Sequence, residues 1–236
     1  MDKFRKAFLV FVVLAFLGAF VKFVMIVPGE KKGEEARVEG KVILPRVNYE
    51  GISVEKAISS RRSVRDFADE NMTIEDLSLL LFAGQGITDE KGHRTAPSAG
   101  ALYPVTLYVH VNRVSGLKKG LYYYSPNEEA LIPIRYGDFS GQIVEACVGQ
   151  RWVGESAASI IVVADFGITR EKYGERGDDY VYMEAGHIGQ NVLLEAVSLG
   201  LGGVPVGGFD RRRMGELLGL DDKKTPVYVL SIGKKR

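Results

Sequence analysis

The most apolar part of the chain is its beginning. Residues Ala7–Val27 contain a single charged side chain, Lys22. As a helix with a rise of 1.5 Å per residue, this stretch would be about 31 Å long, which is enough to cross the hydrocarbon core of a bilayer. We therefore expect 1–27 to be an uncleaved transmembrane anchor. A cleaved signal peptide is the alternative, although its apolar core is usually shorter and no Ala-x-Ala site follows this run.

Basic residues flank this apolar stretch on both sides. Lys3, Arg5 and Lys6 precede it, and Lys31 and Lys32 follow it. The positive-inside rule therefore hardly distinguishes the two orientations. A leading anchor with basic residues before it usually leaves the N-terminus in the cytoplasm, so we expect a membrane-anchored protein whose folded domain lies on the extracytoplasmic side.

The segment that follows, 28–44, is charged, contains glycine and shows no apolar period. This composition predicts a flexible linker. We expect one folded domain over 45–236, which is an ordinary size for a single domain.

Within this domain, several stretches have apolar residues at helical spacing. Thr73 and Asp76 form a capping-box pattern, and apolar positions then recur every three or four residues until Gly84-Gln85-Gly86 ends the helix. Together with this helix, we expect helices at Val54–Ser60, Gln142–Gln150, Tyr180–Leu199 and Arg211–Leu218.

The helix predicted at Tyr180–Leu199 is the longest in this domain. Met183, Gly186 and Gln190 are among the positions that repeat along one of its faces, and Gly189 adds another small residue. Small residues let a second backbone approach closely. We therefore expect a buried central helix or a helix at a subunit interface.

Other stretches show the patterns of strands. Ser159–Asp165 is a continuous apolar run, which is typical of a central strand that is buried on both faces. We also expect strands at Val105–Asn112, Gly120–Ser125 and Pro226–Ile232.

Composition narrows the possible functions. Lys and Arg together number 31 and Asp and Glu 30, so the net charge of +1 does not indicate a nucleic-acid partner. The single cysteine, Cys147, excludes an intramolecular disulfide and a cysteine-cluster metal site, and its apolar neighbours predict a buried thiol. Glu184-x-x-His187 has the spacing of one half of a di-iron carboxylate site, but the sequence contains no second copy of the motif. We predict no metal site.

The densest charge in the domain is Arg61-Arg62-Ser63-Val64-Arg65. At about 4 Å and a protein-like dielectric constant, each pair of guanidinium groups would repel by roughly 4 kcal/mol. An anion would relieve this repulsion, and the planar fork of arginine suits phosphate because two parallel hydrogen bonds form at once. The pattern indicates a phosphate site; an exposed basic patch at a helix end is the alternative.

Two further segments are rich in small residues. Arg94–Pro104 contains Ser-Ala-Gly-Ala at 98–101, and Gly200–Asp210 contains two Gly-Gly pairs. The small residues at 98–101 let a backbone approach a flat ligand closely. A plain turn is the alternative for that segment.

Taken in order, five segments resemble the FMN-dependent nitroreductase family, in particular its SagB-type dehydrogenase branch. They are Arg61–Arg65, Pro97–Pro104, Glu184–Asn191, Val204–Asp210 and the basic C-terminus, and the resemblance covers roughly Tyr49 to the end. It implies an α+β fold: a three-layer sandwich with a mostly antiparallel central sheet flanked by helices. It also implies an interlocked homodimer with FMN at the interface.

The same resemblance implies which residues contact FMN. Arg61, Arg62, Ser63 and Arg65 would hold its phosphate and ribityl chain, and Lys234 and Arg236 would close over the phosphate. The isoalloxazine ring would be lined, from the other subunit, by Pro97, Ser98, Ala99, Gly100 and Ala101. Many members have asparagine where Ala101 stands, so one polar contact to the ring is missing here.

A last group, Val206, Gly207 and Gly208, would face the flavin ring, with the Gly207 amide donating toward N5 or O4. Backbone donors at these atoms stabilise the charge of the reduced ring. Lys172 and Tyr173 look like the pair that azoline dehydrogenases use as a base, since proton removal must accompany hydride loss. A charged surface loop is the alternative for this pair.

These features lead to three hypotheses. The first is an FMN oxidoreductase that moves hydride between NAD(P)H or an organic substrate and a nitroaromatic, a quinone or another acceptor. The second is a SagB-type dehydrogenase that converts azolines to azoles in a peptide substrate. The third is a non-catalytic flavin-binding scaffold or sensor at the membrane.

Overall fold

The structure is a computed structural model, and it describes residues 40–46, 48 and 51–236. The predicted anchor at 1–27 and most of the predicted linker lie outside the described residues. Over the described ranges, no helix is both long and apolar enough to cross a bilayer.

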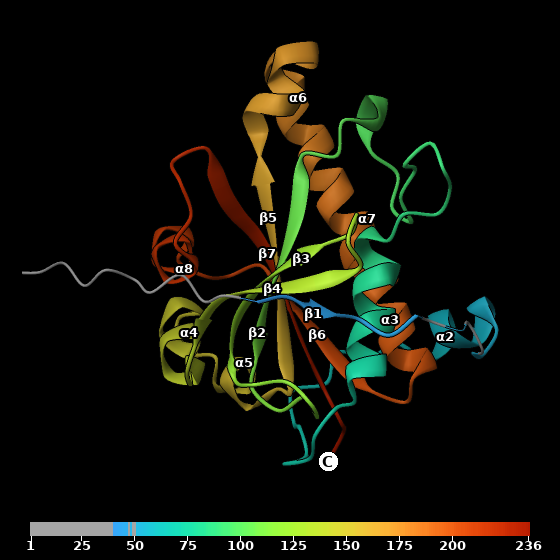
Figure 1. Cartoon of the computed structure of the whole chain (residues 1–236), viewed down its shortest axis with the longest axis vertical. Coiled ribbons are helices and arrows are strands. Elements are labelled where there is room, and N and C mark those ends of the chain that lie inside the picture. The colour runs from blue at the N-terminus through green and yellow to red at the C-terminus, as the bar shows by residue number, and fades with distance from the viewer. Residues whose placement is uncertain (1–39, 47, 49–50) are drawn as a thin grey trace, which may run out of the picture. The chain divides into compact units, whose positions relative to one another are not determined.

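A seven-stranded sheet forms the centre of the described fold (Figure 1). Its strand order is β1-β4-β3-β2-β5-β7-β6, and every neighbouring pair is antiparallel. The antiparallel character that we predicted is therefore confirmed. The strands are β1 (Val42–Ile43), β2 (Val105–Val111), β3 (Gly120–Ser125), β4 (Ala130–Tyr136), β5 (Ala158–Asp165), β6 (Gly202–Val206) and β7 (Lys224–Gly233).

Helices cover both faces of the sheet, which gives three layers. On one face lie α2 (Val54–Ser60), α3 (Ile74–Gln85) and α7 (Gly177–Ser198). On the other face lie α4 (Ser140–Ala146), α5 (Arg151–Glu155) and α8 (Arg211–Leu218). The remaining helical segments are α6 (Phe166–Tyr173) and the short 3-10 turns η1 (Ala99–Ala101) and η2 (Gly174–Arg176).

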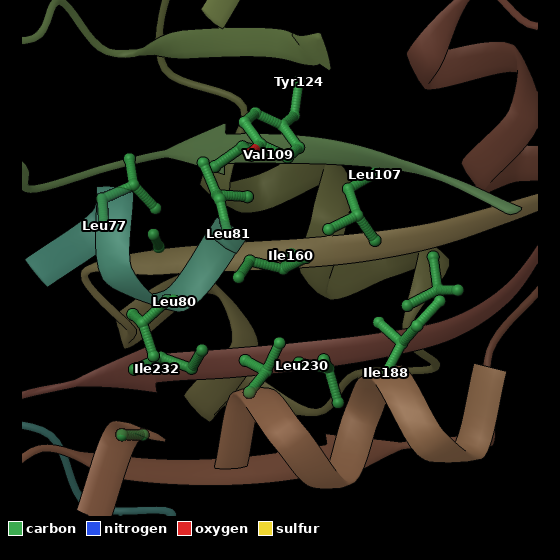
Figure 2. Packing of buried hydrophobic residues seen from close by; sticks show 14 of the residues in the cluster. Leu77, Leu80, Leu81, Leu107, Val109, Tyr124, Ile160, Ile188, Leu230 and Ile232 are labelled. Carbon is green, nitrogen blue, oxygen red and sulfur yellow. The ribbon is translucent and has the colours of Figure 1, made fainter. Parts of the chain in front are cut away.

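The first face holds the larger apolar core. Figure 2 shows Leu80 of α3 and Ile188 of α7 directed at the sheet, where they meet Ile160 of β5 and Leu230 of β7. All four side chains are fully buried, and each contributes about 2 kcal/mol by leaving water. The predicted capping box begins α3: the Thr73 hydroxyl accepts from the Asp76 amide at 3.0 Å.

The strand β5 is buried on both sides, as its continuous apolar run predicted. Ile160 and Val162 belong to the first core, whereas Ile161 and Val163 belong to the second. Cys147 is also fully buried, in the second core, and burial raises the pKa of its thiol to about 12. The thiol is thus neutral and serves as a small apolar group.

The pattern of the sequence did not reveal β4. Pro133 stands in its middle and cannot donate to a ladder. The structure accommodates it with a bulge, because Leu121 pairs with Arg135 while Tyr122 pairs with Pro133, which leaves Ile134 as an extra residue. The strand also pairs with β1, so Val42 and Ile43, which we placed in the linker, belong to the sheet.

Two predicted helices differ from those observed. α4 ends at Ala146, four residues before the predicted end, because Val148 and Gly149 take positive φ values of 56° and 78°. In α7, Met183 is 58% exposed and Gly186 and Gln190 are also exposed. The first half of the face that we expected to be buried thus lies on the surface of the single chain, whereas Gly189 and Leu193 are buried.

Candidate functional site

The arginine cluster lies along the edge of the sheet. Ser63 forms a parallel bridge with Gly203 of β6, and the Val64 amide donates to the Gly203 carbonyl at 3.1 Å. The approach is close enough that a Cβ atom on Gly202 would lie 2.8 Å from the Val64 Cβ. Glycine at position 202 therefore allows the cluster to pack directly on the edge strand.

The C-terminus continues the same edge. The Ala68 amide donates to the Lys234 carbonyl at 2.9 Å, and the Arg236 amide donates to the Asp66 carbonyl at 3.3 Å. The side chains form exposed ion pairs, Lys234 with Glu70 at 3.1 Å and Arg236 with Asp66 at 3.2 Å. The structure thus brings together the arginine cluster and the basic C-terminus, which are far apart in the sequence.

The guanidinium groups of the cluster carry uncompensated charge. In the described part of the chain, Arg61, Arg62 and Arg65 form no ion pair with a carboxylate. Arg62 donates to the backbone carbonyls of Arg61 at 2.7 Å and Ser59 at 3.2 Å. Arg65 lies over the ring of Trp152 at 5.5 Å. This concentration of positive charge fits an anionic ligand and not a structural ion-pair network.

A glycine pair lies beside this cluster. The side chain of Gln150, which precedes α5, donates to the Gly208 carbonyl at 2.7 Å, and Trp152 of α5 reaches Arg65. Gly207 and Gly208 are exposed, and a Cβ atom on either would have no neighbour within 4 Å. The open backbone that follows Val206 therefore leaves room for a flat ligand next to the arginines.

The sequence did not point to Gln150 and Trp152. The nitrogen Nε1 of Trp152 is buried without a hydrogen-bond partner among the described residues. Trp152 is the only tryptophan of the chain, and this was the one feature of the sequence that could have drawn attention to it. Its contact with Arg65 spans 87 residues of sequence and depends on tertiary packing.

The other small-residue segment, Arg94–Pro104, packs against Lys172 and Tyr173. Gly100 has φ of 62°, and a Cβ atom there would lie 2.7 Å from both the Lys172 Nζ and the Tyr173 hydroxyl oxygen. Ala101 and Tyr103 also have positive φ, at 54° and 50°. Such conformations are costly for residues with a Cβ atom and occur at functional sites more often than elsewhere.

The remaining residues of this segment are on or near the surface. Pro97 is exposed, and Ser98 and Ala99 are half-buried. The sequence left open whether Lys172 and Tyr173 lie in a surface loop. The structure places them at the end of helix α6. The ring of Tyr173 packs edge-on against Tyr180 of α7 at 5.1 Å.

A buried polar cluster lies under this segment. Glu184 of α7 is 2% exposed, and it interacts with Gln85, Arg94 and Ser98. Burial raises the pKa of Glu184 to about 6, against the lowering effect of the positive charge of Arg94. The sequence pointed to Glu184 as the start of one of the five segments that carry the family resemblance and as part of a metal motif that we set aside. The described residues contain no group of His, Cys, Asp and Glu side chains that could hold a metal.

The predicted site residues thus form two separate groups. The edge group contains Arg61–Arg65, Val206–Gly208 and Lys234–Arg236; the loop group contains Pro97–Ala101 with Lys172 and Tyr173. Figure 1 shows the C-terminus at one end of the long axis of the fold and α6, which carries Lys172 and Tyr173, at the other end. One chain therefore keeps the arginine cluster and the C-terminus apart from Lys172 and Tyr173, whereas Arg211, three residues after Gly208, reaches Tyr182 of α7 and lies beside α6.

Comparison with known proteins defines the class. The profile described as "Nitroreductase family" matches residues 58–234 and so includes both groups, apart from the last two residues of the chain. The protein "Putative nitroreductase MJ1384" of Methanocaldococcus jannaschii is 39% identical over 188 residues, which is 80% of this chain and 94% of that protein. This chain belongs to the nitroreductase family and is an oxidoreductase of that family.

Solved structures share the fold. A crystal structure of a "putative nitroreductase" from Anabaena variabilis superposes with a TM-score of 0.74 at 30% identity, over 83% of this chain and 42% of that one. The present chain thus spans about two fifths of the Anabaena protein. The McbBCD microcin synthetase complex of E. coli, solved with truncated pro-MccB17, gives a TM-score of 0.65 at 22% identity over 92% of this chain and 85% of that one, which shows a common fold alone.

Proposed function

We propose that this protein is an FMN-dependent oxidoreductase that transfers hydride between NAD(P)H or an organic substrate and an acceptor such as a nitroaromatic or a quinone. The observation that carries this proposal is the set of unpaired guanidinium groups of Arg61, Arg62 and Arg65 beside the open backbone at Gly207 and Gly208. When bound, FMN supplies reversible hydride acceptance at N5 of its ring.

The edge group has the donors that FMN requires. Arg61 and Arg65 bind a phosphate dianion, which removes the mutual repulsion of the cluster, and the Ser63 hydroxyl adds a donor. Lys234 and Arg236 are held by Glu70 and Asp66, but exposed pairs of this kind contribute only about 0–1 kcal/mol each. Both cations can therefore turn toward a bound phosphate at little cost.

Gly207 and Gly208 give the flavin ring room and a backbone donor. Any side chain at Gly207 would project into open space, since a Cβ atom there meets nothing within 4 Å. With glycine there, the backbone N–H can donate toward N5 or O4 of the flavin, where it stabilises negative charge on the reduced ring. The edge group of one chain thus accounts for the phosphate and one side of the ring.

We further propose a homodimer in which the loop group of the partner completes each flavin site. The C-terminus, with the arginine cluster beside it, and α6, with Lys172 and Tyr173, lie at opposite ends of the fold, so a single flavin can contact both only if two chains combine. The surface offers a contact area for this: Ile52 and Val54, which are 42% and 66% exposed, line a groove of about 270 Å3 between α2, α3 and α7, and Ile58 of α2 is 57% exposed. The exposed Met183 face of α7 adds to it.

A mixing experiment tests the composite site. R65A weakens the edge group, and G100W blocks the loop group. Each homodimer should bind FMN poorly, whereas unfolding and refolding the two together should produce heterodimers in which one site is intact. Recovery of FMN fluorescence quenching on mixing supports the composite site; no recovery, although mixed dimers form, contradicts it.

The first experiment on the cofactor is a visible absorption spectrum of the purified full chain, before and after addition of FMN. Flavin bands that remain after desalting and bleach with NADH or NADPH support both the cofactor and the reductase activity. Folded protein that retains no flavin contradicts the proposal. Bound flavin that resists both nucleotides favours direct oxidation of an organic substrate.

A second candidate function is azoline oxidation in a peptide. The observation that favours it is the position of Lys172 and Tyr173 against Gly100, because a proton must be removed as hydride leaves an azoline ring. The fold shared with the microcin synthetase complex is consistent with this candidate. A thiazoline-containing peptide should be oxidised by the wild type and not by K172A or Y173F, while NADH oxidation should depend little on either residue.

We also propose that Ala7–Val27 tethers the protein to a membrane. The support is its length and its single charge. The full chain should sediment with membranes after a carbonate wash, and deletion of 1–27 should release it. Recovery of the full chain in the supernatant would contradict the tether.

A further inference from the structure

The turn between α4 and α5, Cys147–Gln150, has a strained backbone. Val148 has φ of 56° and Gly149 has φ of 78°. Glycine adopts such values freely, whereas a β-branched residue with a positive φ is an outlier. The side chain of Val148 is 73% exposed, so its burial does not offset the strain. Contacts with other parts of the chain must therefore hold this turn in place.

Two such contacts come from the segment that follows β6. The Asp210 amide donates to the Ala146 carbonyl at 2.7 Å. Nε2 of Gln150 donates to the Gly208 carbonyl at 2.7 Å and to the Cys147 carbonyl at 2.9 Å. A primary amide carries two N–H donors, one for each of these carbonyls. These three hydrogen bonds, which we call the turn joint, fasten 208–210 to the end of α4.

Side-chain packing does not hold the glycines at this joint. A Cβ atom on Gly207 or Gly208 would meet nothing within 4 Å, and glycine has the widest choice of backbone conformations. The strand β6 holds the chain up to Val206, and Gln150 holds it again at the Gly208 carbonyl. The Gly207 N–H lies between these two points, so its orientation depends on Gln150.

The same part of the chain also reaches the arginine cluster. Trp152 follows Gln150 by two residues, and the guanidinium carbon of Arg65 lies 5.5 Å from the centre of its ring, within the range of a cation–π interaction. The turn and the start of α5 thus contact the edge group at two places, Gly208 and Arg65. They tie the glycine pair to the arginine cluster.

We propose that Gln150 is a positioning residue: by holding the Gly208 carbonyl against the turn, it orients the Gly207 N–H toward the flavin ring. For its effect on the flavin this inference rests on the proposed function, whereas the turn joint consists of contacts within one chain. An N–H aimed at N5 or O4 stabilises the negative charge of the reduced ring. A well-oriented donor therefore raises the reduction potential of bound flavin.

The variant Q150M tests the turn joint in the full chain without FMN. Methionine has nearly the length of glutamine but no N–H donor. Local opening of the joint then breaks one hydrogen bond fewer, so the Asp210 amide should exchange with solvent about tenfold faster than in the wild type. Q142M is the matched control, because Gln142 is exposed on α4. Its Asp210 amide should exchange like the wild type, and the Ile160 amide of β5 should be unchanged in both variants.

The flavin-bound protein gives a second measurement. When the Gly207 N–H loses its orientation, the ratio of reduced to oxidised flavin at a fixed potential should fall about tenfold in Q150M. For a two-electron couple this change lowers the midpoint potential by about 30 mV. A side chain that only stabilised the fold would not shift the midpoint, and Q142M should keep the wild-type value.

An Asp210 amide that exchanges at the wild-type rate in Q150M overturns the inference, and so does faster exchange that extends to β5. Faster exchange at Asp210 with an unchanged midpoint overturns the role of Gln150 toward the flavin. Failure of the proposed function looks different, because the wild type would then bind no FMN. The exchange of the Asp210 amide would still show whether Gln150 holds the joint.

Discussion

The hydroxyl oxygen of Tyr173 lies 2.7 Å from the position that a Cβ atom on Gly100 would occupy. The Nζ of Lys172 lies at the same distance from it. Real Cβ contacts are longer than this, so any larger residue at position 100 must displace one or both side chains. Gly100 is therefore a means of testing this pair without altering either residue.

We predict that G100A impairs any reaction that depends on Lys172 and Tyr173, by up to about 100-fold, because displacement of a reacting group by about 1 Å has effects of this size. The matched control is G92A. Gly92 has φ of 81°, and a Cβ atom there would meet nothing within 4 Å. Both variants should lose about 1 kcal/mol of stability from the positive φ, and only G100A should lose activity. Equal activities in the two variants would show that the contact has no catalytic importance.

The edge group leads to a prediction about FMN affinity. R65A removes a guanidinium that has no carboxylate partner in the described part of the chain, so FMN should lose a charge-assisted hydrogen bond. The dissociation constant should rise between about tenfold and about 100-fold, measured by quenching of flavin fluorescence. R151A is the control, because Arg151 is exposed and pairs with Glu155 on its own helix. An unchanged affinity in R65A would remove Arg65 from the phosphate site.

The stability of the fold should depend on pH through the titration of His110. This side chain is fully buried on β2, neither ring nitrogen has a hydrogen-bond partner in the described residues, and burial lowers its pKa to about 4. An unfolded histidine titrates near 6.5, so between pH 6.5 and 4 the unfolded chain binds the proton and the folded one does not. Stability is thus complete above pH 6.5 and falls by about 3 kcal/mol as the pH decreases to 4.

Urea denaturation of the wild type and H110L checks this dependence. The difference in free energy of unfolding between the two proteins should grow by about 3 kcal/mol from pH 7 to pH 4, because leucine cannot bind a proton. Titrations elsewhere in the fold affect both proteins and cancel. A constant difference across this range would mean that His110 is not the buried titrating group.

Through Glu184, the stability of the fold should depend on pH in the opposite direction. Burial raises its pKa to about 6 from an ordinary value of 4.5, so the folded state holds the proton more tightly than the unfolded one. The contribution of this group is fully present below pH 4.5 and is lost as the pH rises through 6. Relative to the wild type, E184Q should gain about 2 kcal/mol in free energy of unfolding from pH 4 to pH 8.

The same urea experiment checks this prediction, with the exposed His187 changed to Gln as the control. A gain in the free energy of unfolding would show that the ionised, buried carboxylate of Glu184 costs the fold stability. If the gain is absent, the carboxylate is better solvated or paired than its burial indicates.

Local patterns in the sequence were sufficient where the determining contacts are near in sequence. The capping residue Thr73, the apolar repeat of α3 and the continuous apolar run of β5 each define an element within about a dozen residues, and the structure confirms them. The sequence likewise predicted, without knowledge of the fold, that the positive charge of Arg61–Arg65 needs an anion or solvent beside it. Periodicity and repulsion between neighbours are local quantities, and a sequence displays them directly.

Tertiary structure decided everything that depends on distant partners. Pro133 reads as a strand breaker, and only its pairing opposite Tyr122, with a bulge beside it, makes β4 possible. Neither the contact of Gly100 with Tyr173 nor the burial of Glu184 beside Ser98 can be read from spacing, because each joins residues more than 70 positions apart. The separation of the arginine cluster and the C-terminus from Lys172 and Tyr173 also follows from the path of the whole sheet. Burial and proximity are properties of the packed chain, and they determine which of the residues that the sequence suggested can act together.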